Sequence, residues 1–254
     1  RISYDYQAPV REFGTLGTVM QETKKYIYFM NDFGPSLAPA VAYLPTSNQK
    51  RGNLQWAVRT DGKSGYLFCS NILYRRHRQD FKNVRFTVKL KDETLRIPRQ
   101  RITVSDKAYF LWPFNQSLGK TLLKYATVQP VCSMKEGNET TYFFFEDDGI
   151  AGEYFLSAEG IDKVETVHAA CKKEKNGWFI NALRPGKDCV VTLNCTDGSI
   201  VRLVTLTEEE SDQLWKGTNN GEDYVILTTS SLISDGKKIT LIDEQSSAEA
   251  WIYG

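Results

Sequence analysis

The sequence predicts a mainly β protein: an antiparallel β-sandwich or barrel-like domain preceded by a single strand–helix unit. Apolar and polar residues alternate with period two through most of the chain, which is typical of half-buried strands. Turn pairs such as Asp-Gly and Asn-Gly separate these stretches, so that strands recur about every ten residues. Only one long segment, near the start, has helical spacing. The 254 residues, 41% of them hydrophobic, suffice for one large domain or two small ones.

The one long predicted helix lies near the start of the chain. Its apolar residues recur at three- and four-residue steps and form an apolar stripe: Leu16, Met20, Thr23, Ile27, Met30 and Phe33. Its polar residues fall mostly on the other side: Gln21, Glu22, Lys24, Lys25 and Asp32. This spacing predicts an amphipathic helix that packs through the apolar stripe. We expect the helix to end at Gly34, because Pro35 follows it.

A second, shorter helix is predicted over Thr207–Trp215, where Thr207 and Glu210 have the spacing of a capping box. The clearest predicted strands are Val84–Leu90, Arg101–Val104, Lys187–Leu193 and Lys238–Ile242. The predicted turns are Asp61-Gly62, Lys135–Asn138, Asp197-Gly198, Asn220-Gly221 and Asp235-Gly236. Regular turns of this kind favour an antiparallel domain over alternating strands and helices.

Charge and composition argue against several classes of function. The chain has 32 basic and 31 acidic residues, a net charge of +1, so we expect no nucleic-acid partner and no attraction to an anionic membrane. The two histidines, His77 and His168, are far apart in sequence, and no zinc-ligand spacing or Gly-rich phosphate loop is present. We therefore expect no metal and no cofactor. The five cysteines are expected to be buried free thiols: Cys69, Cys132, Cys171, Cys189 and Cys195.

Charged and aromatic clusters leave functional alternatives open. The carboxylates of Glu146–Asp148 favour a solvated turn, and those of Glu208–Glu210 favour the start of a helix, over an acid–base pair. The basic run Arg75–Arg78 is a phosphate or RNA patch or, as the flanking strands favour, a solvated hairpin tip. Three aromatic runs have two interpretations, stacking on sugar faces or, as favoured here, packing in the core: Tyr142–Phe145, Trp112–Phe114 and Trp178-Phe179.

A segment of glycoside hydrolase family 35 β-galactosidases resembles the opening of this chain, Ser3-Tyr4-Asp5-Tyr6-Gln7-Ala8-Pro9-Val10-Arg11-Glu12-Phe13-Gly14. In that family the segment forms the eighth strand of a catalytic (β/α)8 barrel and the loop after it. The helix that closes with Asn31-Asp32-Phe33-Gly34 resembles the family's last barrel helix. Looser resemblances to the β-domain that follows are Asp61–Phe68, Tyr109–Asn115, Leu123–Pro130, Val204–Glu209 and Gln213–Trp215.

The resemblance implies a division into residues 1–40, a barrel remnant, and residues 41–254, an antiparallel β-domain with a further division expected near 156. It also implies a parent enzyme that removes terminal non-reducing β-galactosyl residues with retention, using two Glu residues. In the family those residues lie on the fourth and seventh barrel strands, upstream of this stretch. We therefore expect no catalytic residue here, and an isolated chain without glycosidase activity. Strand-like residues at both ends lead us to expect an excised piece of a longer protein.

One functional position carries over from the resemblance. The second Tyr of the family motif contacts the bound galactose, and it falls on Tyr6, the predicted substrate-binding residue. A residue at the end of a barrel strand faces the active site, although a plain core aromatic is the alternative. Gln7 and Ile2 depart from the family pattern, so a parent that acts on a different β-glycoside stays open.

The expected partners are a β-galactoside or galacto-oligosaccharide and the upstream catalytic barrel, in a parent that is secreted, periplasmic or at the cell surface. A second hypothesis is a carbohydrate-binding module that recognises galactans through exposed aromatics such as Trp112 or Trp178. A third, a plain adhesion or scaffold sandwich, explains the β pattern but leaves the Ser-Tyr-Asp-Tyr opening unexplained.

Overall fold

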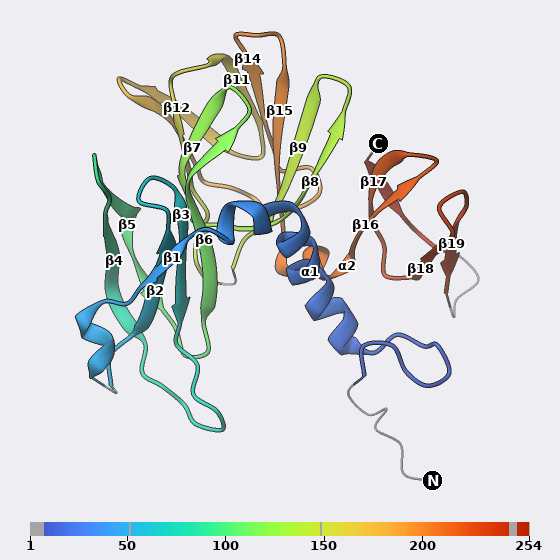
Figure 1. Ribbon diagram of the computed structural model, residues 1–254, viewed down its shortest axis with the longest axis horizontal. Coiled ribbons are helices and arrows are strands. Elements are labelled where there is room, and N and C mark those ends of the chain that lie inside the picture. The colour runs from blue at the N-terminus through green and yellow to red at the C-terminus, as the bar shows by residue number, and fades with distance from the viewer. Residues whose placement is uncertain (1–7, 51, 148, 244–247, 254) are drawn as a thin grey trace.

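The computed structural model describes residues 8–50, 52–147, 149–243 and 248–253. It is mainly β, with antiparallel sheets and one long helix, so the predicted fold class is confirmed (Figure 1). One neighbouring pair of strands departs from the antiparallel rule, since β9 (Glu139–Phe145) and β15 (Ile200–Leu206) run parallel. The predicted strand before the helix falls within residues 1–7, outside the described residues.

The largest sheet has eight strands. Their order across the sheet is β1 (Val41–Tyr43), β2 (Gln55–Thr60), β3 (Gly65–Ser70), β6 (Tyr109–Leu118), β7 (Thr121–Ala126), β10 (Tyr154–Ser157), β13 (Gly177–Asn181) and β12 (Ala170–Glu174). A separate hairpin, β4 (Phe81–Lys89) and β5 (Thr94–Val104), packs on the first half of this sheet. Phe86 of the hairpin meets Trp112 of β6 edge to face, with ring centroids 6.0 Å apart. The hairpin and the sheet therefore enclose one hydrophobic core.

A five-stranded sheet forms the middle of the molecule. Its order is β11 (Ile161–Val167), β14 (Val190–Cys195), β15, β9 and β8 (Gln129–Glu136). Alternate residues of β9 face two different cores, because Phe144 packs in one cluster while Phe143 and Phe145 pack in another. Both faces of this sheet are covered, which is why three consecutive phenylalanines are buried.

The C-terminal part holds two small sheets and the short helix. One sheet has the order β16 (Leu214–Asn219), β17 (Glu222–Leu227) and β20 (Trp251–Tyr253), and the other pairs β18 (Ser231–Ser234) with β19 (Ile239–Ile242). The short helix α2 (Glu208–Gln213) begins as predicted: Glu210 donates its backbone N–H to Thr207 Oγ1 at 3.1 Å, and Glu210 Oε2 accepts from Thr207 N at 3.0 Å. It ends two residues before the predicted Trp215, which lies in β16.

The five predicted turns are confirmed, because each joins two strands that pair in a hairpin. The predicted strands over Val84–Leu90, Arg101–Val104 and Lys238–Ile242 correspond to β4, β5 and β19. The strand predicted over Lys187–Leu193 is shifted, beginning at Val190 and ending at Cys195.

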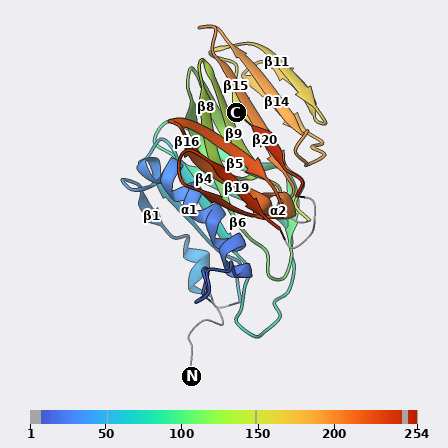
Figure 2. The same ribbon diagram turned by 90° about the vertical axis from the view of Figure 1, so that its right-hand side faces the viewer.

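The long helix α1 (Thr18–Leu37) is confirmed, but its predicted end at Gly34 is wrong. Pro35 lies in its last turn, where proline removes one N–H from the helix, and the backbone N–H of Ala38 donates to Gly34 O at 2.7 Å to close that turn. A short 3-10 helix over Thr46–Gln49 follows β1. α1 packs against β8, α2 and β3, between the large sheet and the C-terminal sheets (Figures 1 and 2).

Candidate functional site

Helix α1 contacts the β-domain through the side that its sequence predicts to be exposed. The side of the helix that packs on the β-domain carries Lys24 and Lys25, which are only 2% and 4% exposed. The middle of the apolar stripe faces the other way, since Ile27 and Met30 are 50% and 54% exposed, whereas Phe33 at its end packs on the β-domain. The expectation that α1 packs through its apolar stripe is therefore wrong for Ile27 and Met30.

The two buried lysines have partners beneath the helix. Lys25 Nζ lies 2.8 Å from Asp212 Oδ1 and 4.7 Å from the centroid of the Phe145 ring. Lys24 Nζ lies 3.9 Å from the centroid of the Trp215 ring, where a cation is attracted by the ring face. Burial lowers the pKa of Lys24 from 10.5 to about 7, partly offset by the carboxylate of Asp212. Paired or ring-covered lysines can lie inside the protein because their charges are compensated there.

Asp32, about two turns further along the same side, makes the second polar anchor. Lys216 Nζ of β16 donates to both oxygens of Asp32, at 2.6 and 2.7 Å. The backbone N–H of Ser133 in β8 donates to the same carboxylate at 2.6 Å. Sequence reasoning placed these charged residues in solvent. The sequence pattern around α1 does not show which distant residues pair with Lys25 and Asp32, because these partners lie more than a hundred residues away in the chain.

Aromatic contacts complete the inner side of α1. Phe29 meets Tyr66 of β3 edge to face at 5.4 Å and stacks on Phe33 at 5.5 Å. The hydroxyls of Ser36 and Tyr66 lie 2.8 Å apart. The inner side of α1 is thus occupied by the β-domain, and of the apolar stripe only Phe33, at its end, takes part in this docking through Phe29 and Tyr142.

On the other side of α1 lies an outer apolar surface, formed by Tyr26, Ile27, Met30, Leu44 and Tyr109, all of which are exposed. Tyr26, Met30, Leu44 and Tyr109 also line an apolar groove of about 550 Å3 that runs along β2 and β3. A contiguous apolar patch of this kind marks an interaction site more often than a free surface. Within the described residues nothing covers it, so it is the strongest candidate functional surface of the chain.

The predicted substrate-binding residue, Tyr6, lies outside the described residues, as do Tyr4 and Asp5. The described chain begins with a folded loop, in which Val10 and Leu16 form a bridge and Gly17 donates its backbone N–H to Pro9 O at 2.9 Å. This loop leads directly into α1. The role of Tyr6 therefore stays a prediction.

Of the first carboxylate cluster, Asp148 lies outside the described residues, and Asp147 is not in the solvated turn that we expected. Asp147 is 8% exposed, because the turn after β9 folds inward and Gln129 of β8 donates its amide to Asp147 Oδ1. Burial raises the pKa of Asp147 from 3.8 to about 7. Glu208, Glu209 and Glu210 occupy the first turn of α2, as predicted.

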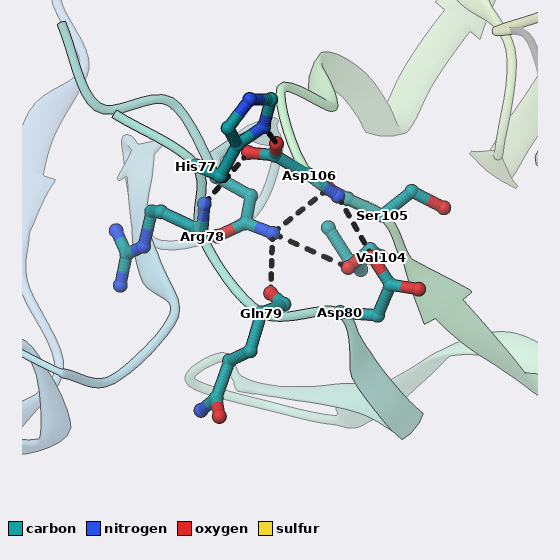
Figure 3. Close-up of polar contacts among 8 residues, drawn as sticks. His77, Arg78, Gln79, Asp80, Val104, Ser105 and Asp106 are labelled. Carbon is teal, nitrogen blue, oxygen red and sulfur yellow. Dashed lines mark hydrogen bonds and ion pairs between the residues drawn. The ribbon is translucent and has the colours of Figure 1, made fainter. Parts of the chain in front are cut away.

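The basic run Arg75–Arg78 is solvated, as favoured, and begins at a tight turn closed by an antiparallel bridge between Leu73 and Arg76. The strands on either side, β3 and β4, lie in different sheets and do not pair with each other as a hairpin. Figure 3 shows how the end of the run is held: His77 Nδ1 lies 2.7 Å from Asp106 Oδ2, and the backbone N–H of Arg78 donates to Asp106 Oδ1 at 3.0 Å. The backbone N–H of Asp106 in turn donates to Asp80 Oδ1 at 3.0 Å.

Beneath this loop, the fully buried Asn71 donates from its amide to three backbone carbonyls, those of Gln79, Val104 and Ser105, at 2.8 to 3.4 Å. The guanidinium of Arg78 donates to Asn53 O at 2.7 Å. His77 and Arg78 are therefore used to hold the loop, which leaves Arg75 and Arg76 as its outward basic groups.

The aromatic runs serve mainly the cores, as favoured. Trp112 and Phe114 are fully buried in β6, so Trp112 presents no face to solvent. Trp178 of β13 is half-buried, and Lys173 Nζ lies 4.9 Å from its ring centroid. Neither indole offers the open platform that the carbohydrate-module hypothesis requires.

All five cysteines are free thiols, and four of them are buried. Cys171 is exposed, contrary to expectation, because it lies on the outermost strand β12 of the large sheet. Among the described residues, no group of three or more His, Cys, Asp or Glu side chains is placed to hold a metal ion. None of the described helices combines the length and apolarity that a bilayer crossing requires.

Comparison with known proteins adds no identification. No family model matches the chain, and no curated protein matches it significantly. Function is therefore inferred from the sequence resemblance and from the outer apolar surface of α1.

Proposed function

We propose that this chain is the non-catalytic, C-terminal part of a retaining β-galactosidase-like glycoside hydrolase. The parent enzyme hydrolyses terminal non-reducing β-galactosyl residues with two Glu residues that lie upstream of this chain. Helix α1 is the last helix of the catalytic (β/α)8 barrel, and the β-domain covers and braces the flank of that barrel. The isolated chain binds no substrate productively and has no turnover.

The inverted docking of α1 is the observation that carries this proposal. The last helix of a barrel packs on barrel strands through its apolar side. When a further domain follows in the chain, that domain meets the opposite, polar side of the helix. α1 has this division: Lys25 and Asp32 bind the β-domain, whereas Ile27 and Met30 remain open for a second partner.

The apolar groove beside α1 extends the same contact surface. It is lined by Met30 and Tyr26 of the helix together with Trp56, Phe68 and Tyr109 of the large sheet. A barrel seated on the outer apolar surface would bury the groove at the same time. In the proposed parent, Tyr6 ends the barrel strand that leads into α1 and donates a hydrogen bond to a galactose hydroxyl.

The carbohydrate-module hypothesis has less support. Its two named indoles, Trp112 and Trp178, are buried and half-buried, as described above. The scaffold hypothesis accounts for the β-domain but gives no reason for an apolar stripe that faces away from it.

The test uses the longer polypeptide that includes the sequence encoded before Arg1. Ile27→Lys places a charge in the proposed barrel contact, and Gln21→Lys places the same charge at an exposed position of α1 outside the stripe. We expect the longer polypeptide to hydrolyse a chromogenic β-galactoside, Ile27→Lys to reduce that activity at least tenfold, and Gln21→Lys to leave it unchanged.

Two results contradict the proposal. One is an upstream sequence that does not have the strand–helix pattern of a barrel or does not place two Glu residues on separate strands of it. The other is equal behaviour of Ile27→Lys and Gln21→Lys in the longer polypeptide. Turnover of the galactoside by the rigorously purified 254-residue chain would overturn the prediction that this part is inactive.

A further inference from the structure

A cleft lined mainly by basic side chains lies between the β4–β5 hairpin, strands β7 and β10, and the turn between β12 and β13. Its volume is about 550 Å3. The charged and aromatic side chains that line it are Arg85, Arg96, Arg99, Lys124, Glu93, Tyr125 and Phe155. Nothing in the proposed galactosidase architecture uses this cleft.

Two of the four cations in the cleft are already neutralised. The guanidinium of Arg99 makes a two-pronged contact with Glu174, at 2.8 and 2.9 Å. Lys124 Nζ donates to both oxygens of Glu93, at 2.8 and 2.7 Å. These pairs join the hairpin to the large sheet, one at each side of the cleft, and leave the charges of Arg85 and Arg96 uncompensated by carboxylates among the described residues.

Arg85 and Arg96 are available to a ligand. Both side chains are exposed, and they project from neighbouring strands of the hairpin. Arg85 donates to the backbone carbonyl of Arg99, which fixes its direction but leaves its charge unbalanced. Arg96 makes no hydrogen bond or ion pair within the described part of the chain. Two guanidinium groups that line the same cleft suit anions with two available oxygens, such as carboxylate or sulfate.

The floor of the cleft is rigid. The Arg99 guanidinium stacks 3.8 Å from the centroid of the Phe179 ring. The buried carboxylate of Glu153 accepts from the Arg99 backbone N–H at 2.6 Å and from the Tyr125 hydroxyl at 2.9 Å. A site whose walls are already held in place loses less conformational entropy when a ligand binds.

We propose that this cleft binds an acidic saccharide, one or two sugar rings that carry a carboxylate or sulfate group. Arg85 and Arg96 hold the anionic group, and the half-buried ring of Phe155 lies against a sugar face. Thr94, Ser157 and Asn176 also line the cleft and supply neutral partners for sugar hydroxyls. The choice of a saccharide over another small acid rests on the proposed function, whereas the anion site rests on the geometry alone.

The charge balance favours a small anion over a nucleic acid. A protein that binds a nucleic-acid backbone typically neutralises about six to ten phosphates, and this cleft has two uncompensated cations. The whole chain adds only a net charge of +1, so no wider field extends the site. A ligand with one or two negative groups matches what the cleft offers.

The test is a calorimetric titration of the 254-residue chain with digalacturonate, and with neutral galactobiose for comparison. We expect digalacturonate to bind in the millimolar range or better and galactobiose to bind at least tenfold more weakly. Arg96→Gln and Arg85→Gln, each at an exposed position, should each weaken digalacturonate binding at least fivefold. Arg76→Gln, which removes an exposed arginine of the β3–β4 loop, should leave it unchanged. Circular dichroism of each variant confirms that the fold is retained.

Three outcomes overturn the inference. If digalacturonate at tenfold excess over a dissociation constant of about 1 mM gives no heat of binding, the cleft is not a binding site for it. An equal loss in Arg76→Gln shows that only the net charge matters. Adenosine monophosphate or inorganic sulfate that binds as tightly as digalacturonate rejects the saccharide in favour of a simple anion. None of these measurements requires turnover, so failure of the galactosidase proposal and failure of this inference are distinguishable.

Discussion

Strand β9 and helix α1 bury opposite kinds of side chain, although β8 contacts both of them. In β9, Phe143, Phe144 and Phe145 are all buried, each against a core that the same chain supplies. In α1, two lysines are buried while Ile27 and Met30 are exposed. An apolar residue is buried where the chain holds the surface that covers it, and for Ile27 and Met30 of α1 the described residues supply no such surface.

The difference separates a region whose apolar surface is covered by the same chain from one whose apolar surface is open to a partner. In β9, apolar burial removes hydrocarbon from water and supplies most of the stability. In α1, the described chain uses charge pairs and ring contacts to place the helix, which contribute little net stability but fix its orientation. The two regions should therefore respond in opposite ways to substitution.

The largest effect is expected in β9. Phe143→Ala removes a fully buried ring from the core that β9 shares with β8 and β17, and leaves a cavity. We expect a loss of about 3–5 kcal/mol in the free energy of unfolding, measured by urea denaturation. Phe13→Ala, at a residue that is 89% exposed, is the matched control and should change stability by less than about 0.5 kcal/mol. A small effect of Phe143→Ala would mean that the two faces of β9 are not both packed.

An intermediate effect is expected at Lys24. In the folded chain its pKa is about 7, against 10.5 for the free side chain, because burial disfavours the charge. Between these values the unfolded chain binds a proton at this site and the folded chain does not, so stability rises with pH from about 7 to 10.5, by up to about 1.4 kcal/mol per pH unit. Below about pH 7 the amine of Lys24 is charged in both the folded and the unfolded chain, so the full cost of burying that charge remains.

Replacing this lysine tests the assignment. Lys24→Met keeps an unbranched side chain one atom shorter and removes the charge, so the variant should be more stable than the wild type near pH 7. That advantage should shrink towards pH 10. Urea denaturation at pH 7, 8.5 and 10 measures both trends, with Lys135→Met, at an exposed lysine of β8, as the control. Parallel pH profiles for Lys24→Met and the wild type would contradict the buried position of this amine.

The smallest effect is expected on the stripe. Ile27→Ala should change the stability of the 254-residue chain by less than about 0.5 kcal/mol, because the side chain is half exposed. In the longer polypeptide with the upstream barrel, the same substitution should cost about 2–4 kcal/mol, because it then empties a covered position. Thermal or urea unfolding of both polypeptides measures the contrast. A loss above about 1 kcal/mol in the short chain would show that the stripe is already covered.

Local sequence chemistry determined much of the fold. Asn220-Gly221 and Asp235-Gly236 predict hairpins because glycine adopts positive φ without strain, and both form them. Thr207 and Glu210 predict the start of α2 because their hydrogen bonds span three residues. Each of these features depends on neighbours in the chain, so the sequence alone is sufficient to find it.

The tertiary structure decided what depends on distant residues. The sequence predicts α1 and its apolar stripe, yet only the fold shows that Asp212 and Lys216 turn the charged side inward. The fold also buries Asp147 against Gln129. It places Arg96 of the hairpin in the same cleft as Lys124 of β7. Periodicity describes which side of an element is apolar, but the direction in which that side points is set by the sum of its contacts, and those contacts join residues far apart in the chain.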